Sequence, residues 1–145
     1  MFRSGKSKPI LCLDFDGVIH SYSSGWQGIA NIPDPPIAGA LAFIEQAIAD
    51  GWQVAIYSAR SRSLRGRWAM KSWLKRHLDA YTLPMEADDI YTSIRWPWFK
   101  PPAIITLDDR AITFTGTFPA RAELKAFQRS EEHTSELQSH HVISY

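Results

Sequence analysis

Two acidic residues directly follow the first apolar run of the chain. Residues 10–13 have the sequence Ile-Leu-Cys-Leu, and Asp14, Asp16 and Gly17 come immediately after them. Alternation along a strand sends residues i and i+2 to one side, so both carboxylates can face one point where the strand ends. Glycine then lets the backbone turn away from the sheet. Because neighbouring carboxylates repel each other unless a cation lies between them, the pair predicts a site for a hard divalent ion, above all Mg²⁺.

Further polar groups lie beside apolar runs later in the chain. Ser58 follows a second apolar run, Lys100 precedes a third, and Asp108 and Asp109 end that third run. A lone pair of acids is also common in solvated turns and helix caps, so the first pair by itself carries little weight. All the groups together, in this order, predict a metal site that handles phosphate.

Apolar runs alternate with stretches of helical periodicity along the chain. We expect five strands, at residues 10–15, 52–57, 91–94, 103–107 and 111–114. Helices are expected between the first two strands, at 64–78 and at 119–127. This alternation predicts an α/β fold with a Rossmann-like, mainly parallel sheet of about five strands and helices on both faces. The Ser- and Gly-rich residues 20–33 predict a small flap after the first strand.

The predicted fold places the polar groups together. Ligands of open parallel sheets bind outside the carboxyl ends of the strands, where Asp16, Ser58 and Asp108 all fall. Asp34 before a proline is typical of the first turn of a helix. In the helix at 64–78, apolar residues that include Trp68 are expected to face inward.

Length and composition predict one globular domain, residues 1–128. The chain has 145 residues, of which 45% are apolar and 12% aromatic, enough for a core. Residues 129–145 look like the translation of a sequencing-library adapter, so we expect this tail to be non-native. The alternative is a short charged helix in which His140 and His141 bind a metal.

Charge and cysteine content give weaker information. The formal net charge is +1, so no global field indicates a nucleic-acid or membrane partner. The single cysteine, Cys12, excludes an internal disulfide and predicts core packing in a reducing compartment. No apolar run has the length of a membrane span or follows the pattern of a signal sequence. We therefore expect a cytoplasmic protein without a membrane partner, whose oligomeric state the sequence does not define.

The ordered motifs resemble those of the haloacid dehalogenase-like (HAD) superfamily of Mg²⁺-dependent phosphohydrolases. That family has D-x-D-G after its first strand, Ser or Thr after the second, a Lys further on and an acidic pair after a later strand. The resemblance runs from Asp14 to Asp109 and covers most of the chain. It implies a capless or minimal-cap phosphatase, because one flap and one helix fill the interval in which the family often inserts a cap domain.

The resemblance implies a role for each acid. Asp14 would be the nucleophile that forms an aspartyl-phosphate, and Asp16 would act as general acid and base, which requires a raised proton affinity. Mg²⁺ would be held by Asp14, the main-chain carbonyl of Asp16, and Asp108, with Asp109 as a second ligand or an orienting group. Which of the two adjacent aspartates contacts the metal directly stays open.

By the same resemblance, Ser58 and Lys100 would bind the transferred phosphoryl group. Ser58 would offer its hydroxyl, with backbone N–H groups at Ala59 and Arg60, and Lys100 would supply a positive charge. The alternatives are a helix N-cap for Ser58 and a solvated surface position for Lys100. The approach to Lys100 is unusually aromatic, which leaves Arg95 as the alternative cation.

Two segments bear on the substrate. His20, Tyr22 and Trp26 could stack on a base or sugar, or could instead hold their own loop in place. Residues 60–77 contain seven Lys or Arg residues and no acid, which is typical of a groove for a polyanion or of a solvated helix face. The sequence therefore predicts a phosphomonoester hydrolase acting on a phosphorylated small molecule, a nucleotide or a nucleic-acid end.

Three other classes of protein fit parts of the pattern. A phosphotransferase would use the same aspartyl intermediate. A receiver-type signalling domain combines similar residues, but its phosphorylated aspartate follows a middle strand, where this chain has Ser58. A non-catalytic phosphate-binding module would keep the same groups without turnover.

Overall fold

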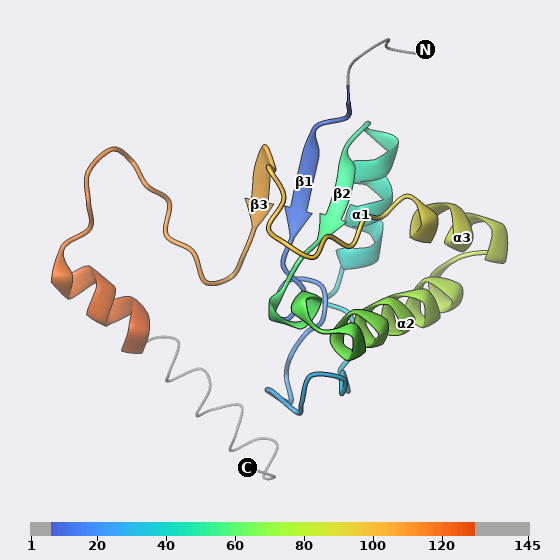
Figure 1. Cartoon of the computed structure of the whole chain (residues 1–145), viewed down its shortest axis with the longest axis horizontal. Coiled ribbons are helices and arrows are strands. Elements are labelled where there is room, and N and C mark those ends of the chain that lie inside the picture. Colours follow the sequence, from blue (N-terminus) through green and yellow to red (C-terminus); the bar gives the residue numbers. More distant parts are fainter. Residues whose placement is uncertain (1–6, 130–145) are drawn as a thin grey trace.

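The protein folds around a small parallel β-sheet (Figure 1). The computed structural model describes residues 7–129, and the sheet in this part of the chain has three strands in the order β2-β1-β3. The strands are β1 (Ile10–Leu13), β2 (Gln53–Ile56) and β3 (Ile105–Leu107). The α/β class and the parallel sheet are confirmed. The expected number of about five strands is wrong for residues 7–129, where 91–94 and 111–114 form no strand.

β1 is the central strand and pairs in parallel with both neighbours. The hydrogen bonding continues just past the strand ends. The N–H of Asp14 donates to the carbonyl of Leu107 at 3.0 Å, and that of Tyr57 donates to the carbonyl of Leu13 at 3.1 Å. The carboxyl ends of all three strands therefore lie at one edge of the sheet, the edge at which parallel α/β sheets bind ligands.

Three α-helices pack on one face of the sheet. They are α1 (Ala40–Ala49), α2 (Leu64–Tyr81) and α3 (Pro84–Thr92). Their buried side chains form one cluster with Leu11, Leu13, Val54 and Ile56, which share one face because Leu11 is in register with Val54. The expectation of helices on both faces is therefore wrong for the described part of the chain.

α1 begins later than the sequence predicts. Its N-cap is Gly39, with φ +86°, rather than Asp34. The carboxylate of Asp34 instead accepts hydrogen bonds from the backbone N–H (2.7 Å) and the hydroxyl (2.5 Å) of Ser24. Asp34 therefore holds the two ends of the flap together through Ser24, and no side chain caps α1.

Half of the segment predicted as the third strand belongs to a helix: Tyr91 and Thr92 end α3, and Ser93 and Ile94 follow it without forming a strand. Ala87 and Ile90 are buried on the inner face of α3, as expected of a helix that packs on a core. After α3, the first residue that pairs with a strand is Arg95, which forms an isolated bridge to Ala55 in β2. In α2, Trp68 is 69% exposed, so its expected inward position is also wrong.

The chain after β3 extends away from the helices (Figure 1). Residues 121–129 are helical, close to the helix predicted at 119–127. The segment predicted to be a non-native tail lies outside the described residues, except for Arg129. Within residues 7–129, no helix combines the length and the apolar character needed to cross a membrane.

Candidate metal centre

Three carboxylates meet at the carboxyl edge of the sheet. Asp14 follows β1, and Asp108 and Asp109 follow the neighbouring strand β3. One oxygen from each of the three lies within 4.8 Å of the other two. Asp14 is half-buried, whereas Asp108 and Asp109 are exposed. The parallel pairing of β1 with β3 therefore joins acids that are more than ninety positions apart in the sequence.

Gly17 allows the two acidic loops to approach each other. Its φ is +86°, a conformation that residues with a side chain rarely adopt. A Cβ atom at this position would lie 2.3 Å from Oδ2 of Asp109. The glycine after the first acidic pair is thus needed for its turn and also for the space that Asp109 occupies.

Electrostatics at this point favour a bound cation. Burial, followed by the charges of Asp108, Asp109 and Asp16, raises the pKa of Asp14 to about 7. The backbone N–H of Phe15, which donates to Oδ1 of Asp14 at 2.8 Å, opposes this shift. A cation between the carboxylates would offset both the burial and the repulsion that keep this proton bound.

The donor set fits Mg²⁺. All three groups offer hard carboxylate oxygens, and Mg²⁺ binds such oxygens at about 2.0–2.1 Å, so two ligands across an octahedron lie about 4.2 Å apart. The three oxygens lie within 4.8 Å of one another, close to that spacing. Asp14, Asp108 and Asp109 are therefore the side chains that could hold the ion.

Asp16 faces a different set of partners. Arg60 donates from Nε to Oδ2 at 2.9 Å and from Nη2 to Oδ1 at 3.2 Å, and Nδ1 of His20 lies 2.8 Å from Oδ1. Burial would raise the pKa of Asp16, but the hydrogen bonds from His20 and Arg60 and the charge of Arg60 lower it overall. The acid–base role implied for Asp16 requires a raised proton affinity, and the hydrogen bonds from His20 and Arg60 produce the opposite.

Arg60 is a fully buried cation that joins the flap to the acidic loop. Its Nη1 donates to the carbonyls of Gly28 and Ile29, each at 2.8 Å, and its guanidinium lies 4.5 Å from the ring centroid of Trp26. The resemblance implies that Arg60 binds the substrate through its backbone N–H. In the structure its side-chain donors are directed at Asp16 and at the flap.

His20 holds its own loop in place, which is one of the two alternatives that the sequence left open. It is buried, and the N–H of Asp34 donates to its Nε2 at 3.1 Å. Nε2 must then be an acceptor, so in the neutral ring the proton is on Nδ1, which donates to Asp16. The ring also packs against Phe15 and Trp73.

A cavity of about 210 Å³ opens beside the acids. The residues that line it come from the acidic loops, the flap and the turn after β2: Asp14, Asp16, Tyr22, Trp26, Ser58, Ala59, Asp109 and Arg110. The structure thus brings most of the predicted site residues together. It adds Arg110, a cation whose only signal in the sequence was its position next to the acidic pair.

Ser58 and Lys100 occupy different kinds of position. Ser58 lines the cavity and is also the N-cap of a short 3₁₀-helix, η1 (Ala59–Arg62), where its hydroxyl accepts from the N–H of Arg60 at 3.1 Å. Lys100 is exposed and is not one of the residues that line the cavity. Ser58 therefore shares this cavity with Asp14, and Lys100 does not.

Comparison of the chain with protein-family models, curated proteins and solved structures gives no match. The fold and the site define the class of protein: an α/β protein with a three-strand parallel sheet and an exposed aspartate cluster at the carboxyl edge of that sheet.

Proposed function

We propose that the chain is a Mg²⁺-dependent phosphomonoester hydrolase of the HAD type that acts through an aspartyl-phosphate. One observation carries this proposal: carboxylates from two adjacent parallel strands, Asp14, Asp108 and Asp109, lie within 4.8 Å of one another beside a cavity. Phosphate monoesters resist hydrolysis because their charge repels nucleophiles, so positioning and charge neutralisation are the main demands on a catalyst. Bound Mg²⁺ would supply that neutralisation.

Asp14 is the proposed nucleophile. Its carboxylate oxygen forms a bond to phosphorus while the bond from phosphorus to the leaving oxygen breaks. A water molecule then attacks the same phosphorus, which releases inorganic phosphate and restores the carboxylate. The N–H of Phe15 on Oδ1 orients the group for this attack.

Asp16 is suited to only one half of the acid–base role. Its lowered pKa keeps it ionised at neutral pH, so it can accept a proton from the attacking water but has none to donate to a leaving group. The proposal therefore favours phosphomonoesters whose leaving oxygen is stable as an anion, such as aryl phosphates.

The small cavity suits the phosphoryl group itself. Ser58 contributes a hydroxyl and Arg110 a cation to its lining, and the indole of Trp26 lies over the buried Arg60. A phosphorylated group can enter this space while the rest of the substrate stays outside, as a minimal-cap site requires.

The test is phosphate release by the purified full chain with Mg²⁺ and a panel of aryl and alkyl phosphomonoesters. We expect turnover that EDTA abolishes and that Asp14→Asn lowers by several orders of magnitude. Asp89→Asn, the same change at an exposed position of α3, serves as the matched control and should keep full activity. Wild type that releases no more phosphate than Asp14→Asn would refute the proposal.

A non-catalytic phosphate-binding module is the second candidate. It is favoured by the position of Lys100, which does not line the cavity that Asp14 lines. In that case wild type would bind Mg²⁺ and inorganic phosphate but would hydrolyse no phosphomonoester. Asp14→Asn would lose this binding.

A further inference from the structure

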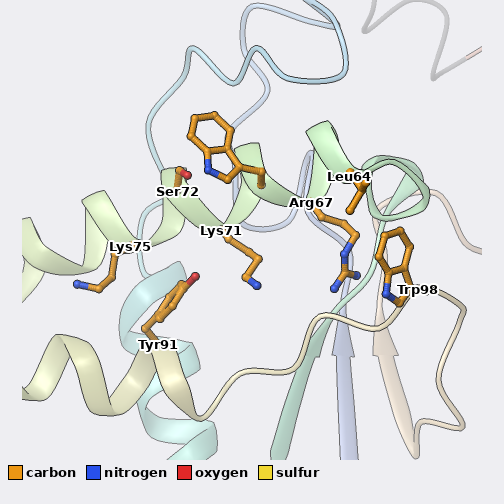
Figure 2. Close-up of a pocket in the computed structure, with 8 residues that line it drawn as sticks. Leu64, Arg67, Lys71, Ser72, Lys75, Tyr91 and Trp98 are labelled. Atoms are coloured by element: carbon orange, nitrogen blue, oxygen red, sulfur yellow. The ribbon is translucent and has the colours of Figure 1, made fainter.

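A second, larger cavity lies along α2, apart from the acid cluster (Figure 2). Its volume is about 540 Å³, and it is bounded by α2 and by the segment from the end of α3 to Trp98. The side chains that matter for its chemistry are Arg67, Trp68, Lys71, Lys75, Tyr91 and Trp98. It combines cations with aromatic rings, and the proposed hydrolysis uses none of these residues.

The cations form a row on one side of α2. Arg67, Lys71 and Lys75 are four residues apart, so they lie on one face of the helix at steps of about 6 Å along its axis. Lys75 is paired with Asp79 and Asp88, each at 3.2 Å. Lys71 has no ion pair within residues 7–129, so its charge is available to a ligand.

Arg67 is held in place at the end of the row nearest the sheet. Its guanidinium lies 4.0 Å from the ring centroid of Trp98, and its Nη1 donates to the carbonyl of Trp96. Figure 2 shows Arg67 and Lys71 projecting from α2 toward the segment that carries Trp98. Arg95, next to Trp96, accepts a hydrogen bond from the N–H of Ile56 at the end of β2, so the cavity begins at the carboxyl edge of the sheet.

Two indoles beside these cations face solvent. Trp68 is 69% exposed and Trp98 is 43% exposed. Tryptophan is normally well buried, so two exposed indoles at one cavity indicate a surface that binds a partner. A planar aromatic group stacked on an indole would remove this apolar area from water.

We infer that this cavity binds single-stranded nucleic acid, with phosphates on Arg67 and Lys71 and a base stacked on Trp68, the more exposed of the two indoles. A positively charged groove with aromatic platforms is the general arrangement for single strands. The volume exceeds the needs of a lone phosphate and lies in the range of sites for larger ligands. An acidic peptide would match the charges but would leave the indoles exposed.

The inference goes beyond the proposed hydrolysis and does not depend on it. Binding is therefore measured in EDTA, by fluorescence anisotropy of an end-labelled oligothymidine with the full chain. We expect Lys71→Glu to weaken binding about tenfold or more, since it reverses a phosphate contact. Trp68→Ala should weaken binding by about five- to a hundredfold through lost stacking.

Arg76→Glu is the matched control. Arg76 is exposed on α2, does not line the cavity, and undergoes the same change of charge. We expect it to weaken binding less than about threefold. Equal weakening by Arg76→Glu and Lys71→Glu would overturn the site, because binding would then follow the overall charge of the helix.

Competition tests the class of ligand. Polyglutamate of matched charge should displace the oligothymidine far less effectively than an unlabelled single strand does. Equal displacement by polyglutamate, equal binding of duplex DNA, or an unchanged affinity of Trp68→Ala would each overturn the assignment to single-stranded nucleic acid. Circular dichroism of each variant checks that it is folded.

Discussion

Arg60 shows how one side chain can connect distant parts of this chain. It is fully buried, and within residues 7–129 its side-chain hydrogen bonds go to Asp16 and to two flap carbonyls. A buried ion pair has a large desolvation cost, so removing one partner leaves the other charge uncompensated. The flap and the acidic loop therefore depend on this residue for their relative position.

We predict that Arg60→Met lowers the free energy of unfolding by about 3 kcal/mol, because Asp16 loses its charge partner. Denaturant unfolding monitored by tryptophan fluorescence measures this change. Arg62→Met is the control, since Arg62 is exposed in the same short helix and its loss should change stability by less than about 0.5 kcal/mol. Equal effects of the two substitutions would contradict the account of Arg60.

Asp14 makes stability depend on pH. The folded protein keeps the Asp14 proton up to about pH 7, whereas the ordinary pKa is 3.8. As pH rises through this window, the unfolded chain releases the proton more readily than the folded chain, so this carboxyl makes folding less favourable. Above about pH 7 the whole of this cost is present.

We therefore predict that wild type loses stability relative to Asp14→Asn between about pH 4 and pH 7, by about 1–2 kcal/mol after allowance for solvent screening. At pH 8, Mg²⁺ should restore the stability that wild type has lost. At pH 5 it should have no such effect, since protons compete with the metal. Thermal unfolding at several pH values, with and without Mg²⁺, measures both effects. A difference between the two proteins that does not vary with pH would contradict the position of Asp14.

At the scale of elements, the contact between the loops after β1 and β3 decides whether the site exists. β1 and β3 bring their acids to one edge, and Gly17 lets the two loops touch. The three-residue β3 is exposed along its length, so it contributes little core to hold its loop in place. The acidic loop after it thus relies on local geometry.

We predict that Gly17→Ala weakens Mg²⁺ binding about tenfold or more, because the new Cβ would occupy the position of the Asp109 carboxylate. Isothermal titration calorimetry measures the affinity. Gly51→Ala is the matched control: Gly51 has φ +98° and open space around its Cβ position, so it shares the backbone strain of about 1–2 kcal/mol without the clash. Similar affinity losses in both variants would show that strain alone is responsible.

At the scale of the whole molecule, residues 7–129 form a sheet covered by helices on one face. Both candidate sites open at its carboxyl edge, the acid cluster between β1 and β3 and the basic cavity beyond β2. A strand of nucleic acid bound along α2 would therefore approach the edge at which Asp14 lies. This arrangement connects the two proposals in space while leaving their tests separate.

The sequence by itself determined the parallel α/β class, the three strands and the position of the acids at strand ends. Apolar runs and the residues that end them are local features, and parallel pairing then places those ends side by side. The sequence did not predict the helix at residues 84–92, because only Ala87 and Ile90 of its nine residues are buried and so its apolar pattern is weak.

Only the tertiary structure decided the partners of Asp16 and the solvent exposure of Trp68. Arg60 is 44 positions away from Asp16, and no periodicity links the two. Their ion pair exists because the flap folds over the turn after β2 and buries Arg60 against Asp16. Long-range hydrogen bonds of this kind set proton affinity: those from His20 and Arg60 outweigh burial and lower the pKa of Asp16, which is the reverse of the shift that the sequence predicts.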